Sequence, residues 1–134
     1  MIESGPSLLQ NYSAWILVVT FALSAGYELW RATAKAGTSV HDSISAFIRV
    51  DLPLYAIGAA VIFTLFAGYS WAPWMGLAFC VVLILVSIFY YNPVMMLERE
   101  PGLIDWFEDF VYTGLLFVAA ALLLLEVLGY SLVR

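Results

Sequence analysis

The amino-acid sequence predicts an all-α integral membrane protein with four transmembrane helices in a small bundle. Of its 134 residues, 64% are hydrophobic and only 11% are charged, whereas soluble domains carry about 25% charged residues. The charges are also unevenly spaced and leave uncharged windows at residues 13–27, 52–97 and 110–125. One crossing of a bilayer needs about 20 apolar residues. The 46 residues of the middle window therefore predict two crossings, and the chain is expected to form one membrane domain over residues 1–134.

The first transmembrane helix is expected at about residues 13–31. Trp15 and Trp30 lie near its two ends, about 22 Å apart along a helix, which is close to the separation of the two aromatic belts of a bilayer. The connection that follows has apolar residues at helical spacings: Val40, Ile44, Phe47 and Ile48. This pattern predicts a short amphipathic helix at about residues 39–50, lying on the membrane surface.

The sequence GYSWAPW divides the middle window into helices expected at about residues 52–68 and 74–91. Pro53 suits the first turn of the earlier helix, where its missing N–H is not needed. Gly58, Ala59 and Ala60 are small and are expected to face another helix. The later helix is expected to end before Pro93, because a proline disfavours helical geometry in the residue that precedes it.

The fourth helix, expected at about residues 104–130, has an acidic face. Asp105, Glu108 and Asp109 lie on one side of its first turns. Glu126 points the same way, because it follows Glu108 by 18 residues, which is five turns. Two interpretations remain open. The helix dipole favours carboxylates in a first turn by about 0.3–1 kcal/mol each, whereas ionisable groups within a membrane also mark cation and proton paths.

The basic residues predict the orientation of the chain. Those expected on one side of the four-helix layout are Arg31, Lys35, Arg49 and Arg99, and Arg134 is expected on the other. Because positive charges concentrate in cytoplasmic loops, both termini are expected to be extracytoplasmic. The chain is expected in a cell membrane or an energy-transducing membrane.

Ion pairs are expected at the cytoplasmic rim of the bundle. Glu28 can pair with Arg31 one turn later, and Arg31 or Arg49 can instead meet the carboxylates of the fourth helix. Such a network would fix the order of the helices or dock a partner subunit. The candidate interaction residues are Glu28, Arg31, Arg49, Asp105, Glu108, Asp109 and Glu126.

The sequence offers no recognised catalytic or metal-binding pattern. His41 is the single histidine and belongs to no HxxxH or HExxH motif, and Cys80 is the single cysteine. The sequence contains no GxSxG motif, phosphate-binding loop or basic patch. We therefore expect no catalytic residues, metal, cofactor or nucleic-acid partner, and we expect bound lipid.

Three functions are compatible with these features. The leading hypothesis is a non-catalytic structural or accessory subunit of a larger membrane complex, whose partners are the lipid bilayer and other integral membrane subunits. It rests on the missing catalytic set and on the many aromatic residues suited to lipid and protein contacts. The alternative is a small homo-oligomeric transporter or channel that uses its intramembrane carboxylates for a cation or for proton coupling. A third is a membrane enzyme that uses the acidic cytoplasmic rim.

Overall fold

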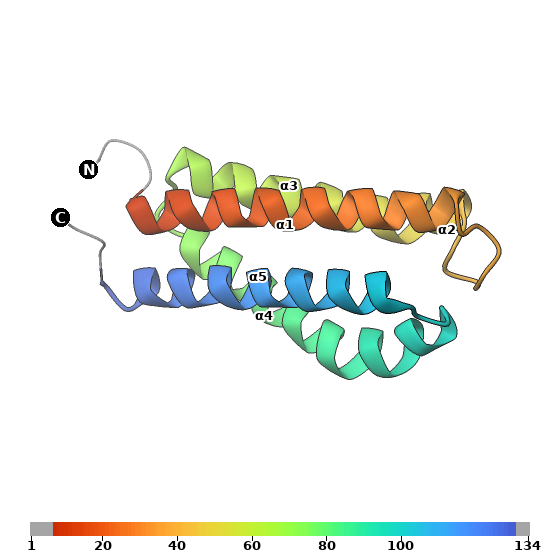
Figure 1. Ribbon diagram of the computed structural model, residues 1–134. Coiled ribbons are helices and arrows are strands. Elements are labelled where there is room, and N and C mark those ends of the chain that lie inside the picture. The colour runs from red at the N-terminus through yellow and green to blue at the C-terminus, as the bar shows by residue number, and fades with distance from the viewer. Residues whose placement is uncertain (1–6, 131–134) are drawn as a thin grey trace.

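The computed structural model describes residues 7–130, which form helices joined by short connections (Figure 1). In chain order these are α1 (Leu8–Thr33), α2 (Ile44–Ala46), the π-helix η1 (Phe47–Asp51), α3 (Leu52–Ala67), α4 (Ala72–Val86), the π-helix η2 (Ser87–Met96) and α5 (Leu103–Val127). The segments 44–67 and 72–96 are each continuous, so four helices are long and apolar enough to cross a membrane. This confirms the all-α, four-helix class for the described residues. Arg134 lies outside them.

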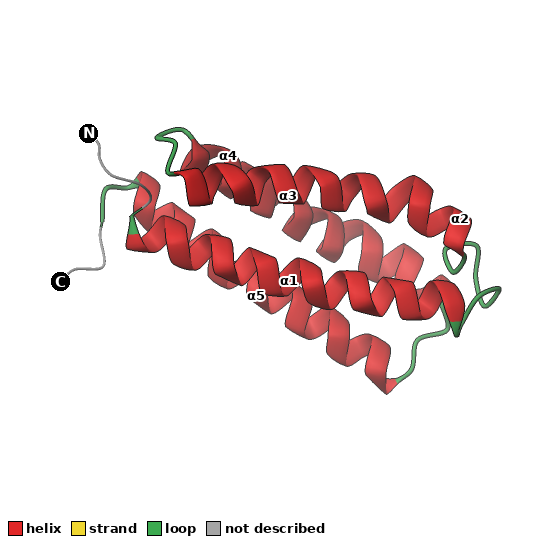
Figure 2. Cartoon of the chain, turned by 90° about the horizontal axis from the view of Figure 1, so that it is seen from above, coloured by secondary structure: helices red, strands yellow, loops and turns green. Residues whose placement is uncertain are grey.

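The four long segments close into a ring. α1 packs against α3 and α5, and α4 packs against the same two helices. The described chain ends and the turn at 68–71 lie at one end of the bundle (Figure 1). The connections at 34–43 and 97–102 lie at the other, which we call the polar end (Figures 1 and 2). α4 runs obliquely across the bundle, so that η2 lies away from α3 at the polar end (Figure 1).

Several expected boundaries differ from the structure: α1 begins at Leu8 and not at about residue 13, α5 ends at Val127 and not at about residue 130, and two further differences change the path of the chain. The third helix does not end before Pro93 but continues as η2 to Met96. In an α-helix a proline removes one hydrogen bond and its ring clashes with the preceding turn, whereas the wider π-helical turn has a different hydrogen-bond register. The separate helix expected at 39–50 is also replaced: residues 44–51 are helical but run on into α3 through η1, which comes just before Pro53.

Apolar side chains fill the half of the bundle away from the polar end. The fully buried residues there include Leu17, Leu65, Cys80, Leu116 and Leu123. Gly76 allows α4 to come close to its neighbours, because a Cβ at this position would lie 3.1 Å from the Leu123 side chain and 3.4 Å from that of Leu65. This half is consequently sealed by direct apolar packing.

Small residues of α3 meet α1 at one position. Gly58 is buried, and a Cβ there would lie 3.0 Å from Cε2 of Phe21. Ala59 and Ala60 are exposed, so of the three small residues only Gly58 is buried within the described chain. A helix turns by 100° per residue, and successive residues cannot all point at one neighbour.

The contrast between adjacent residues gives a test of this packing. Gly58→Leu should lower the free energy of unfolding by about 1–3 kcal/mol, because the added side chain overpacks against Phe21. Ala59→Leu, the matched control, should leave it nearly unchanged. Circular dichroism during denaturant unfolding in detergent micelles measures both. Equal unfolding midpoints for the two variants would contradict the assigned contact.

Candidate functional site

The polar end is held together by two buried arginines. Arg31, in the last turn of α1, binds Asp42 with two hydrogen bonds, from Nε to Oδ1 at 3.0 Å and from Nη2 to Oδ2 at 2.6 Å. Its Nη1 also donates to Asp105 Oδ1 on α5 at 3.0 Å. Arg99, from the 97–102 connection, binds Glu28 on α1 in the same two-pronged way, at 2.6 and 3.0 Å. We call Glu28, Arg31, Asp42, Arg99 and Asp105 the arginine clamp.

Arg99 is the most enclosed member of the clamp. Its side chain is 1% exposed, lies 3.2 Å from Asp42 Oδ1 through Nε, and donates to the Tyr91 hydroxyl at 3.0 Å. Burial alone lowers the pKa of this guanidinium. The hydrogen bonds and charge of Glu28 outweigh it, so the pKa lies above its ordinary value and Arg99 stays charged.

Asp105 has two structural roles at the start of α5. Its Oδ2 accepts a 2.7 Å hydrogen bond from the backbone N–H of Gly102 and caps the helix. Its Oδ1 accepts from Arg31 and from the Tyr27 hydroxyl. This one carboxylate therefore caps α5 where the 97–102 connection ends, and it also joins α5 to α1.

The other ion pairs expected at the rim have different partners in the structure. Glu28 binds Arg99 and not its neighbour Arg31. Arg49 is exposed, and its Nε donates to Ser45 Oγ at 3.2 Å. Asp42, which holds both arginines, was not foreseen, because a loop residue next to His41 carries no periodic signal.

The side chains of Glu126, one of the candidate interaction residues, and of His41, where no metal site is expected, make contacts outside the clamp. Glu126, at the opposite end of α5, accepts a 2.7 Å hydrogen bond from Ser7 Oγ. His41 Nε2 lies 2.6 Å from Glu98 at the exposed edge of the polar end. A hydrogen bond within the fold therefore accounts for each of these two side chains.

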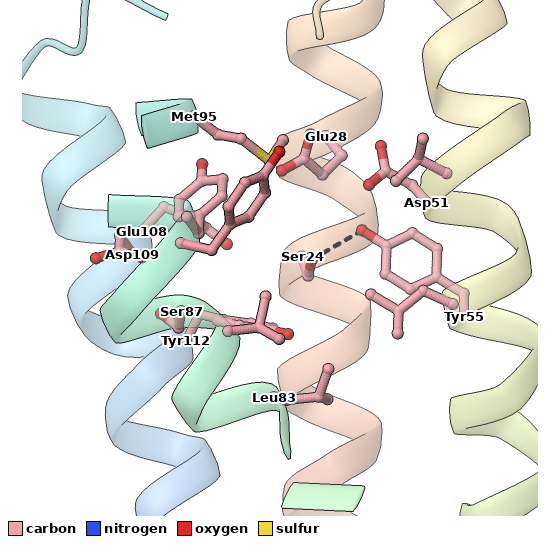
Figure 3. Close-up of a pocket in the computed structure, with 15 residues that line it drawn as sticks. Ser24, Glu28, Asp51, Tyr55, Leu83, Ser87, Met95, Glu108, Asp109 and Tyr112 are labelled. Carbon is pink, nitrogen blue, oxygen red and sulfur yellow. Dashed lines mark hydrogen bonds between the residues drawn. The ribbon is translucent and has the colours of Figure 1, made fainter. Parts of the chain in front are cut away.

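Next to the clamp, a cavity of about 210 Å³ opens between α1, α3, η2 and α5 (Figure 3). Its lining includes four carboxyl groups, from Glu28, Asp51, Glu108 and Asp109. Figure 3 shows these residues on elements at both sides of the same space, with Glu28 on α1 and Asp51 at the end of η1, just before α3. The acidic face of α5 is therefore divided: Asp105 joins the clamp, and the next two acids line the cavity.

Glu108 differs from every acid of the clamp. It is only 8% exposed, and among residues 7–130 no hydrogen bond or ion pair to its carboxyl group occurs. Each of the clamp carboxylates, by contrast, binds an arginine. A buried carboxyl without a partner is costly, so Glu108 lacks the structural explanation that accounts for Asp105.

The remaining lining comes from aromatic and apolar residues. Tyr55, Tyr90, Tyr91 and Tyr112 contribute rings, and the apolar part is formed by Val50, Leu54, Leu83, Val86 and Met95. Ser24 Oγ and the Tyr55 hydroxyl share a 2.7 Å hydrogen bond at the wall (Figure 3). η2 alone supplies four lining residues, so the π-helical turn that carries the chain past Pro93 also shapes the cavity. Single π-helical turns are frequent at functional sites.

Negative charge exceeds positive charge in this region. The buried charged residues of the described chain are two arginines and four acids, namely Arg31, Arg99, Asp42, Asp105, Glu108 and Asp109. Half-buried Glu28 and Asp51 add to the excess. Ionised groups at this depth need compensation by protons or by cations. Within residues 7–130, no three His, Cys, Asp or Glu side chains are grouped closely enough to hold a metal ion.

Comparison with protein-family models, with curated proteins and with solved structures finds no match for this chain. The chemistry of the site follows from its residues alone. They can attract and hold a positive charge inside the bundle.

The clamp gives a second test. Arg31→Gln should lower the free energy of unfolding by about 3–5 kcal/mol, because it removes the guanidinium charge that buried Asp42 and Asp105 share. Arg49→Gln, at an exposed arginine, should change it by less than about 0.5 kcal/mol. Unfolding in mixed micelles, followed by tryptophan fluorescence, measures the difference. Similar losses for both variants would show that the clamp does not hold the polar end.

Proposed function

We propose that this chain is a small integral membrane protein that binds a cation in its acid-lined cavity and carries it across the bilayer. The observation that supports this function best is the carboxyl group of Glu108, which is buried, has no partner in the described chain and lines the cavity. Ionisable groups within a membrane usually face a binding site or an ion path. A positive ligand would supply the compensation that the protein itself does not provide.

The distribution of packing favours a carrier over an open channel. The cavity occupies the half of the bundle next to the clamp, whereas Leu17, Leu65 and Leu123 are fully buried in the other half. A cation cannot pass through close-packed apolar side chains without a rearrangement. Transport therefore requires a second conformation in which the sealed half opens.

In the proposed orientation the polar end faces the cytoplasm, because Arg31, Lys35, Arg49 and Arg99 belong to it. In a Cys80→Ala background, Thr38→Cys should resist an impermeant thiol reagent in intact cells, and Ser70→Cys should react. Both positions are exposed and lie at opposite ends of the bundle. The reverse labelling pattern would invert the orientation.

A transport measurement tests the function directly. Proteoliposomes containing the full chain should give currents on a solid-supported membrane with one or more cations of a panel from sodium to benzylammonium. Glu108→Gln should reduce the current at least about tenfold, because it removes the charge that holds the cation. Glu126→Gln is the matched control, on the same helix but bound to Ser7 and far from the cavity, and should transport normally. Equal currents from both variants, or no current from wild type, would contradict the proposal.

The second candidate is the accessory subunit expected from the sequence. It is favoured by the large apolar faces of the segments 44–67 and 103–127, in whose apolar stretches only 17% of the residues are buried. Phe107 and Phe110 are 67% and 78% exposed on α5. Such faces can contact either lipid or the helices of another subunit. Native purification followed by mass spectrometry separates the two: co-purifying larger membrane subunits would support this candidate, and an isolated chain or homo-oligomer would exclude it.

A further inference from the structure

The cavity has a charged part and an apolar part, and we propose that its ligand has the same two parts: an ammonium group on an apolar body. We further propose that this ligand enters sideways from the bilayer, between α3 and η2. This substrate class rests on the proposed function, since it specifies which cation the cavity binds. The charged part is given by Glu108, which is nine-tenths buried and has no partner among residues 7–130.

The size and lining of the cavity fit a ligand with several heavy atoms. A single water needs about 10–15 Å³ of such space, so about 210 Å³ is far more than one desolvated ion fills. Leu54, Leu83 and Val86 offer apolar contacts away from the carboxyl groups. Burying an apolar body there would add a favourable contribution of roughly 25 cal/mol per Å².

The donors fit an ammonium group better than a metal ion. The carboxyl groups come from three separate helical segments, and within residues 7–130 no three of them form a metal-binding group. An ammonium group needs only one or two carboxylates, and it is also attracted to the faces of aromatic rings. Tyr55 and Tyr112 contribute aromatic rings to the lining.

The route into the cavity is lateral. Arg31 and Arg99 are 2% and 1% exposed, so the clamp covers the polar end. The exposed lining residues are Val50 at 59% and Val86 at 45%, on the α3 side and the α4 side of the opening, with Tyr90 at 49% beside Val86. Figure 3 shows α3 and η2 on opposite sides of the space. This rim is apolar, which suits a ligand that partitions into the bilayer.

Binding of radiolabelled benzylammonium to the full chain in phosphatidylglycerol nanodiscs, whose lipid has no ammonium group, tests this class after subtraction of binding to nanodiscs without protein. Equilibrium dialysis should show saturable binding to wild type, with no competition from neutral benzyl alcohol. Glu108→Gln should weaken binding roughly 30-fold or more, because one partner of a buried charge pair is lost. Glu126→Gln should bind like wild type. Unfolding midpoints of the variants close to that of wild type verify that they are folded.

A second pair of variants tests the lateral opening. Val86→Trp should obstruct the rim and slow the association of benzylammonium about tenfold, as measured by rapid filtration. Val82→Trp is the matched control: it introduces the same side chain one turn earlier, at a residue that is 56% exposed and outside the lining. It should not change the association rate. Equal association rates in the two variants would overturn the lateral route.

The outcomes separate this inference from the proposed function. If sodium or potassium binds in a Glu108-dependent way and benzylammonium does not, the function stands and the ligand class is wrong. If no cation binds, both are wrong. Phosphatidylethanolamine added to the nanodiscs identifies the source of the ammonium group. Competition with benzylammonium assigns the site to a lipid headgroup, and lack of competition assigns it to a free amine; either result supports the class.

Discussion

The polar end of the bundle depends on pairing two buried guanidinium groups. An arginine removed from water must recover its hydration through hydrogen bonds and opposite charge, and a carboxylate with two oxygens in the guanidinium plane does this best. Asp42 and Glu28 provide such pairs for Arg31 and Arg99. The pairs join α1, both long connections and the start of α5, so the geometry next to the cavity is set by the clamp.

The cavity lies beside the clamp, where η2 diverges from α3. α4 packs closely at its beginning, where Gly76 allows contact with Leu65 and Leu123, and then runs obliquely away (Figure 1). The gap that opens toward η2 is lined by polar groups, which an apolar ligand alone would leave unsatisfied. One end of the bundle thus has the packing of a closed core, and the other has the lining of a binding site.

The sequence predicts the four long helices, because long uncharged windows indicate helices that are long and apolar enough to cross a membrane. It also predicts that Asp105, Glu108 and Asp109 share one face, since helical spacing determines direction. Helical spacing does not determine which group each carboxylate contacts, and these three residues have different surroundings. Asp42 lies in a connection without periodicity, and the helical path past Pro93 depends on a π-turn for which the sequence gives no signal. The cavity could not be foreseen either, because it depends on how α4 crosses its neighbours.

The contrast between paired and unpaired acids separates the structural from the functional interpretation of α5. Asp105 and Glu126 lie at the two ends of this helix, and each accepts hydrogen bonds that account for it. If Glu108 served the fold in the same way, it would also have a donor, because a buried carboxyl group without one destabilises the protein. Natural proteins leave such requirements unmet mainly at functional sites. The buried carboxyl group of Glu108 has no donor and lies beside a cavity large enough for a ligand. The acids that do have donors lie where the chain needs to be held.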